Sequence, residues 1–504
     1  MNCQVKSVEA FMYNARFATL LVLALIFAIA LPAQSTAQTK FKYNGVYTAW
    51  GQSQHAFTFD HDSYEDNYVV QMFRLNLSFS GSENVKAVTR FDLGQGWWGI
   101  DNALRSVQRT GTSGGSALFD FKDTNFLFHV DHAYVQFKLP DKPLTFRVGR
   151  MNYSLGNRIM IDNNYDGVQL DIKTGENRKL TLSWAKVSEG GDNLSDLEVV
   201  DNAGNTIADN RDANLYIANF SGKTPSLKYN VYGFYFRDAS INDMNAYVPD
   251  KLQFFKTRFS AQPTKLMSVG VSGEYTAGKF SLIGEFDYLT GKDEIANTTY
   301  GAKQMWDIND GNLSGFNLYL KSNYTVSPKF TLGGVFGMGS GDDDLTGGKG
   351  NINKLRTSGF FYITEIWEDS IMPDEEGISP QGLGAPNVRG YRELENTTAL
   401  QVNGSFRPTK KLELFSSFTY LKSTQPVFAW SMVNGMPVID TATSANDLGT
   451  EIDFRISYKI EKGLSAHLRG GFFTPGTAAG YLIRGTDTFT DIAWELKGMV
   501  TYKF

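Results

Sequence analysis

The chain has 504 residues, and its 53 Asp and Glu outnumber its 48 Lys and Arg to give a net charge of −5. This acidic balance, with no basic run, argues against a nucleic-acid partner, and the single cysteine, Cys3, excludes a disulfide scaffold. Aromatic residues make up 14% of the chain and Gly is abundant at 49, a composition that suits many strands joined by tight turns.

The first segment has the features of an export signal. Lys6 and Arg16 precede the apolar run 17–31, and Pro32 and a small-x-small site ending at Ala37 follow it. A run of about 15 apolar residues is short for a bilayer core of about 30 Å, which disfavours a transmembrane helix. We therefore predict a cleaved signal peptide over 1–37 and one domain over 38–504. No later apolar run reaches the length of a membrane-spanning helix.

The remainder of the chain repeats a period-two pattern. Apolar or aromatic residues alternate with polar ones, which is typical of strands with one apolar and one polar face. Eighteen stretches show it or fit between such stretches: 41–47, 73–79, 85–93, 133–139, 144–150, 168–172, 180–184, 213–221, 227–237, 268–276, 280–289, 316–324, 330–339, 399–407, 412–421, 452–460, 464–472 and 494–504.

Connections between these strands alternate between short turns and long loops. The long ones are expected at 52–67, 94–125, 188–211, 238–266, 340–396 and 422–447. This alternation predicts an all-β fold, a transmembrane antiparallel up-and-down β-barrel with short periplasmic turns and long extracellular loops. About 18 strands are expected, or 16 if the pair at 213–221 and 227–237, whose phase is ambiguous, or one other weak pair does not form strands. An even number returns both termini to the periplasm.

The last strand predicts the partners of such a barrel. Every second residue from Trp494 to Phe504 is apolar, aromatic or Gly, so one face suits membrane lipid and closes the sheet. A final Phe504 is also expected to engage the barrel-assembly machinery. The predicted location is the outer membrane of a Gram-negative bacterium.

Three groups of residues resemble the alginate-export family of outer-membrane porins. The first is 146–150 with Gly156, Arg158 and 166–168; the second is 339–342; the third is 448–455 followed by 471–476. The resemblance implies an eighteen-stranded barrel over most of the chain, in agreement with the strand pattern, and an anionic sugar or oligosaccharide as solute.

The phase of each strand predicts which charged residues face the lumen. Basic side chains outnumber acidic ones among these positions, which permits an anion-favouring channel, because guanidinium groups bind carboxylates in bidentate fashion. Opposite charges that merely pair across the wall of a general pore are the alternative. The pore-lining candidates are Arg74, Arg90, Arg147, Glu451, Asp453, Arg455, Arg469 and Lys497.

The loop over 340–396 is longer than a barrel connection needs. Its apolar residues at 360–363 and 366–367 are expected to dock against the inner wall or another loop, so that the loop constricts the pore. Asp342, Asp343 and Asp344 are a candidate site for Ca²⁺, with a solvated acidic loop tip as the alternative.

The sequence therefore predicts a porin for passive diffusion of small hydrophilic solutes, with anionic sugars or oligosaccharides as candidates, and without a cofactor. A closed barrel whose loops bind or adhere at the cell surface is the alternative. An enzyme is not expected, because no Ser/His or Cys/His set falls on one strand face. The letters of a dinucleotide motif at 94–99 lack the helix that this motif requires.

Overall fold

A computed structural model describes residues 39–61, 65–98, 127–188, 199–200, 206–207, 213–238, 264–294, 310–342, 353, 355, 361–371, 394–433, 436–489 and 491–504. The signal peptide predicted over 1–37 lies outside these residues. Within them, no helix has both the length and the apolar character that a membrane span requires.

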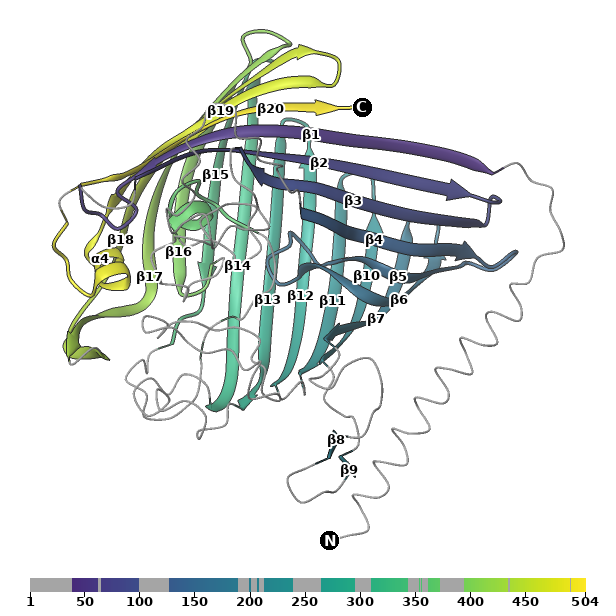
Figure 1. The fold of residues 1–504 in the computed structure, drawn as a ribbon, viewed down its shortest axis with the longest axis horizontal. Coiled ribbons are helices and arrows are strands. Elements are labelled where there is room, and N and C mark those ends of the chain that lie inside the picture. Colours follow the sequence, from purple (N-terminus) through teal and green to yellow (C-terminus); the bar gives the residue numbers. More distant parts are fainter. Residues whose placement is uncertain are drawn as a thin grey trace, which may run out of the picture.

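Eighteen antiparallel strands form one sheet that closes on itself (Figure 1). Each pairs with its neighbours along the chain, and the first pairs with the last, from Val46 opposite Lys503 to His55 opposite Trp494. A separate two-residue pair, β8 (Val199–Val200) and β9 (Thr206–Ile207), stands between β7 and β10. The predicted number of strands is confirmed. The sheet consists of β1 (Lys40–His55), β2 (Asp66–Ser80), β3 (Val85–Trp97), β4 (Leu127–Lys138), β5 (Leu144–Ser154), β6 (Asp162–Gly175), β7 (Arg178–Ser188), β10 (Ala213–Lys223), β11 (Leu227–Asp238), β12 (Thr264–Ala277), β13 (Phe280–Glu294), β14 (Asp310–Ser327), β15 (Phe330–Gly339), β16 (Thr397–Phe406), β17 (Leu412–Val433), β18 (Met436–Glu461), β19 (Leu464–Pro475) and β20 (Ala493–Lys503).

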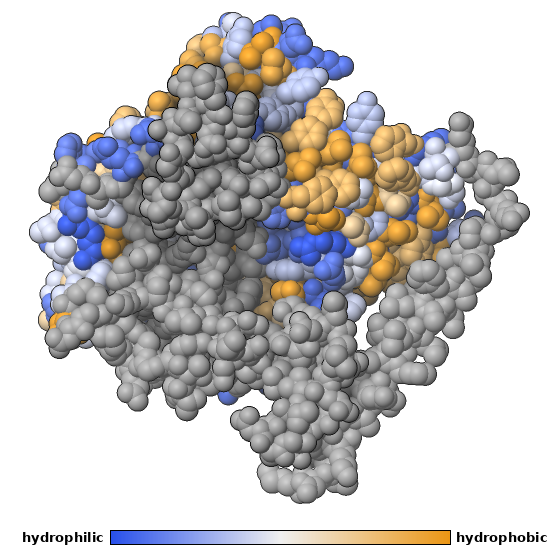
Figure 2. Space-filling view, viewed as in Figure 1, coloured by the Kyte–Doolittle hydropathy of each residue, from blue (hydrophilic) through white to orange (hydrophobic). Residues whose placement is uncertain are grey.

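The outer face of the barrel is apolar, as Figure 2 shows where orange side chains cover much of the surface at the right. Val, Leu and Ile side chains are exposed along most strands. Aromatic side chains gather toward the strand ends that carry the short turns, as expected for a girdle at a membrane interface. These are Phe41, Tyr43, Phe79, Tyr275, Phe280, Tyr324, Phe406, Tyr458, Tyr502 and Phe504.

The hairpin of β17 and β18 differs from the prediction of a loop over 422–447. Both strands continue far past the barrel rim, and they remain paired through three register shifts, at Leu421/Lys422, Lys422/Val427 and Phe428/Ala429. These irregularities interrupt the alternation of apolar and polar residues. The sequence pattern therefore ends near residue 421, although the hydrogen-bonded pairing of the two strands continues to Val433 and Met436. The helix α4 (Thr477–Arg484) packs against this hairpin and contributes to an apolar cluster with Trp430 and Leu448.

Both ends of the barrel chain lie at the short-turn end. The backbone of Phe504 exchanges two hydrogen bonds with Gly45, at 3.0 and 3.1 Å, and its ring stacks on Phe73 at 5.9 Å. Gly45 is required here, because a Cβ at this position would lie 2.7 Å from the backbone carbonyl oxygen of Arg74 as well as 2.4 Å from the Phe504 ring. The last residue is thereby part of the closing seam between β1 and β20.

Candidate functional site

A segment of the long connection between β15 and β16 lies inside the barrel. Residues 361–371 include the short π-helix η2 (Trp367–Ile371), and Glu451 of β18 accepts hydrogen bonds from the backbone N–H groups of Ile366 and Trp367, at 2.7 and 2.9 Å. Trp367 is buried and stacks on Phe473 at 5.0 Å. A carboxylate that caps two orphan N–H groups of a helical turn, together with an apolar anchor, fixes this lumen segment on the inner wall.

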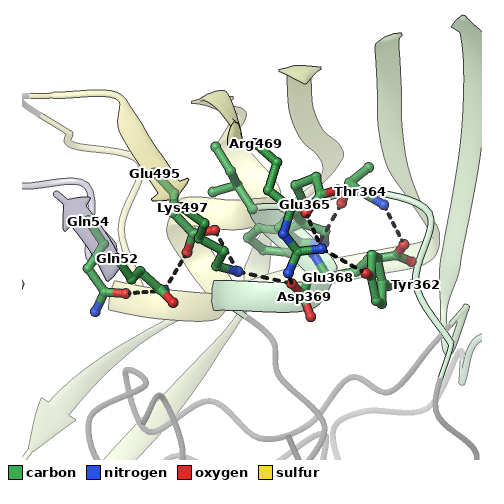
Figure 3. A network of polar contacts seen from close by, with 12 residues as sticks. Gln52, Gln54, Tyr362, Thr364, Glu365, Glu368, Asp369, Arg469, Glu495 and Lys497 are labelled. Carbon is green, nitrogen blue, oxygen red and sulfur yellow. Dashed lines mark hydrogen bonds and ion pairs between the residues drawn. The ribbon is translucent and has the colours of Figure 1, made fainter. Parts of the chain in front are cut away.

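Two basic side chains of the wall also hold the lumen segment (Figure 3). Arg469 of β19 forms ion pairs with Glu365 at 3.2 Å and Asp369 at 3.6 Å, and it donates a hydrogen bond to Tyr362 at 3.2 Å. Lys497 of β20 bonds the same Asp369 at 3.0 Å and Glu495 at 2.6 Å. Both candidate cations therefore face the lumen segment.

Glu368 is a buried acid within the lumen segment. Its carboxylate accepts hydrogen bonds from the N–H groups of Ile363 at 2.6 Å and Thr364 at 3.3 Å. Burial nevertheless raises its pKa to about 7, since the low-dielectric surroundings disfavour the charged form more than these hydrogen bonds favour it. The phase of the strands could not identify this acid, because Glu368 does not belong to a strand.

A second segment, residues 155–161 between β5 and β6, also packs inside the barrel. Ile159, Met160 and Ile161 are buried. They belong to an apolar cluster with inner-wall residues of the strands from β10 to β14, and the backbone N–H of Asn157 donates to Glu285 of β13. The inner wall is thus locally apolar, which explains why the phase of 213–237 is ambiguous in the sequence. The wall residues in this cluster include Leu215, Ile217, Phe234, Phe236, Leu266, Leu289 and Leu313.

Three predicted lumen arginines form ion pairs on the wall from β2 to β6. Arg74 binds Asp92 through two nitrogens, at 2.7 and 2.5 Å. Arg90 pairs with Asp131 of β4. The alternation of residues along β4 did not predict that Asp131 faces the lumen. The register shift between Arg90 and Phe91 interrupts this alternation and turns Asp131 inward.

Arg147 of β5 is held by neighbours on β6. It donates to Gln169 at 2.8 Å and to Asp171 at 2.9 Å. Lys179 of β7 contacts the same Asp171 at 3.3 Å. Together with the pairs of Arg74 and Arg90, these contacts match the arrangement in which opposite charges pair across strands of a pore wall.

Arg455 differs from the other basic candidates. Within the part of the chain that the structure describes, no carboxylate lies within ion-pair distance of it, and its guanidinium stacks over Phe415 at 4.9 Å. Lys321 of β14 also has no described carboxylate at ion-pair distance, and it lies within electrostatic reach of Arg455. Asp453, the neighbour of Arg455 on β18, instead accepts a hydrogen bond from Ser417 at 3.2 Å. Arg455 and Lys321 thus form a cationic pair with no described carboxylate at ion-pair distance, and Glu413 of β17 lies within electrostatic reach of Arg455.

A second basic surface lies at the short-turn end of the barrel. A cavity of about 510 Å³ between the turns of β6–β7 and β10–β11 is lined by five basic side chains and two acidic ones. Lys228 is partly neutralised by Glu274 at 2.8 Å. The basic lining residues are Lys173, Arg178, Lys179, Lys223 and Lys228, and the acidic ones are Asp171 and Glu176.

The acidic candidate for Ca²⁺ is only partly visible. Asp342 is buried and lies three residues after the end of β15. Asp343 and Asp344 lie outside the described residues, so this site stays a prediction.

Comparisons with known proteins agree with the fold. The family model described as alginate export matches residues 384–482, which include the third of the sequence groups above, and this confirms the resemblance in that part of the chain. No curated protein matches the sequence. Two solved structures from Pseudomonas aeruginosa, OccK8 (OprE) and OccK9 (OpdG), each share 12% identity at a TM-score of 0.50, covering 92% of this chain and 98% of theirs. A BenF-like porin from Pseudomonas fluorescens shares 12% identity at a TM-score of 0.48, over 92% of this chain and 98% of its own.

Proposed function

Because the chain is a β-barrel protein of the bacterial outer membrane, we propose that it is a channel for passive diffusion of small hydrophilic solutes, with a preference for anions. The observation that carries the proposal is the cationic pair Arg455 and Lys321, which faces the lumen with no described carboxylate at ion-pair distance. Unpaired cations with a low-dielectric wall behind them attract anions more strongly than pairs that are already neutralised.

The basic cavity at the short-turn end supports the same preference. Its lining has three more basic than acidic side chains, one of which, Lys228, is paired with Glu274, and it lies at the expected periplasmic mouth. An anion would therefore meet positive potential there as well as at Arg455. The two surfaces lie on different parts of the wall and act in series along the barrel axis. Carboxylated sugars, which the resemblance to the alginate-export family suggests, fit this charge distribution.

The lumen segment supplies the proposed constriction. Residues 361–371 occupy part of the cross-section and are fixed by Glu451, Arg469 and Lys497. Residues 155–161 fill a further part from the β5–β6 side. Ion selectivity of a channel is strongest where the path is narrow and the charges of the wall are close to the solute.

Residues 155–161 and 361–371, which both lie inside the barrel, also favour a second function. This is a closed barrel whose loops bind partners at the cell surface.

Single-channel conductance of the refolded protein in planar bilayers distinguishes the two functions. We expect steady conductance and a reversal potential of the sign given by anions under a salt gradient. A folded barrel with no conductance would support the closed form, and cation preference would remove the role of Arg455.

A further inference from the structure

Three parts of the chain meet at the long-loop end of the seam that closes the barrel. They are the end of β1 at His55, the connection that follows it, and the stretch before β20. The N–H of Asp491 donates to the carbonyl of Phe59 at 3.3 Å, and Arg484 pairs with Asp60 at 2.7 Å. The Phe59 ring belongs to the apolar cluster that includes Phe473. The two connections are therefore fixed against each other by backbone, charge and apolar contacts.

Two imidazoles and a carboxylate converge within this assembly. His55 Nε2 lies 3.0 Å and His61 Nδ1 lies 2.9 Å from the same oxygen, Oδ2 of Asp491. One ligand atom from each residue lies within 4.8 Å of the other two. The other carboxylate oxygen, Oδ1, accepts the N–H of Ile492 at 2.8 Å, which orients the carboxylate.

His55 is oriented by groups outside this trio. Its Nδ1 lies 2.7 Å from Oε1 of Glu65, and its ring stacks on Trp494 at 5.7 Å. A carboxylate on the far nitrogen of an imidazole is the usual support of a metal-bound histidine, because it fixes the tautomer with the lone pair on the other nitrogen. Here that other nitrogen points at Asp491 and His61.

Without a metal ion, this geometry requires additional protons. A neutral imidazole donates from one nitrogen only, whereas both nitrogens of His55 face carboxylate oxygens. A divalent cation between His55, His61 and Asp491 would take the place of the extra protons. It would accept the lone pairs of two neutral imidazoles and balance the charge of the carboxylate. Imidazole and carboxylate together favour Zn²⁺ and its neighbours over Ca²⁺ or Mg²⁺.

We propose that His55, His61 and Asp491 bind one divalent transition-metal ion, zinc being the reference case, at the outer end of the β1–β20 seam. Metal–ligand bonds of about 2.0–2.2 Å place tetrahedral donors about 3.3–3.6 Å apart. The separations of His55 Nε2 and His61 Nδ1 from Asp491 Oδ2, 3.0 and 2.9 Å, therefore need to open by only a few tenths of an ångström. Water completes the coordination. The bound ion joins the connection after β1 to the stretch before β20, and so clamps the first strand to the last.

Calorimetric titration of the refolded protein in detergent with ZnCl₂ tests the proposal. We expect one Zn²⁺ per chain, no displacement by Ca²⁺, and a higher temperature for the heat-induced mobility shift of the barrel on gels. His61→Ala and Asp491→Asn should each lower the affinity by about tenfold or more, and Glu65→Gln, a positioning change, by about 10–100-fold. His61 is exposed, so its replacement leaves the packing intact.

His129→Ala is the matched control, since His129 is an exposed histidine of β4 outside this cluster. It should bind zinc as the unchanged protein does. Absence of binding up to about 1 mM Zn²⁺, a free energy of only about −4 kcal/mol, would overturn the proposal and leave an ordinary network of histidine–carboxylate ion pairs. Equal zinc affinity in folded His61→Ala and Asp491→Asn would equally overturn it, because the ion would then be held elsewhere.

Discussion

Replacement of Glu451 by alanine should release the lumen segment from the wall. Glu451 is fully buried, and its two oxygens accept the N–H groups of Ile366 and Trp367. The change removes both acceptors and leaves two buried backbone donors without them. It does not touch the outer face of β18, where Ile452 faces lipid, so the barrel itself should still form.

The size of the effect follows from these two contacts. Leaving a buried backbone N–H without an acceptor costs about 1–3 kcal/mol, so the loss of both acceptors weakens docking by about 2 kcal/mol or more. At about 1.4 kcal/mol for each factor of ten, this shifts the docking equilibrium by about thirtyfold or more. Arg469 and Lys497 still bind Asp369, so the segment should visit released positions rather than leave the lumen.

Single-channel recording in planar bilayers measures this release. Glu451→Ala should show a larger mean conductance, or frequent steps to larger levels, and Glu451→Gln a smaller change because one oxygen remains. Glu413→Ala is the matched control, since Glu413 lies on the inner face of β17 and contacts Ser405 and Arg407 instead of the segment. Conductance and noise equal to those of the unchanged protein in a folded Glu451→Ala barrel would refute this role of Glu451.

Two further changes test the lumen segment and the barrel wall. Glu368 has its pKa raised from 4.5 to about 7 by burial, so docking is favoured below about pH 4.5 and loses up to about 3 kcal/mol as the pH rises through 7. Conductance should therefore increase between pH 5.5 and 8.5, and Glu368→Gln should remove this dependence; a slope that persists in the variant would assign it to another group. Gly149 has φ +124°, and a Cβ there would lie 2.3 Å from the carbonyl oxygen of Ala133. Gly149→Ala should destabilise the barrel by about 1–3 kcal/mol in urea unfolding, whereas Gly498→Ala, whose Cβ meets nothing within 4 Å, should have a small effect; equal stability of both would contradict the steric reason.

The period-two pattern was sufficient to predict the barrel. Each lipid-facing strand must keep one apolar face, and this requirement appears directly in the residues of β2, β18 and β20. The inward phase of Arg74, Arg147 and Arg455 follows from the same alternation. The number of strands can be counted from the sequence as well, because each short turn joins two strands that are neighbours both along the chain and in the sheet.

The lumen was less predictable, because its contents come from irregular chain. Glu365 and Asp369 bind Arg469 from a loop segment whose position depends on docking, not on a repeat. Asp131 faces inward only because of a bulge in β4. The basic excess expected from strand phase alone is therefore largely neutralised on the wall, and Arg455 and Lys321 stand out only once the contacts are known.

The reversal potential in a salt gradient, measured for the unchanged protein and for Arg455→Glu, tests the proposed channel most directly. We expect anion preference in the unchanged protein, and a shift of the reversal potential toward the cation side in the variant, because an acid replaces one of two cations that have no described carboxylate at ion-pair distance. Arg74→Gln, which removes a cation already paired with Asp92, should have a smaller effect. Equal reversal potentials in the unchanged protein and Arg455→Glu would contradict a selective role for the cationic pair.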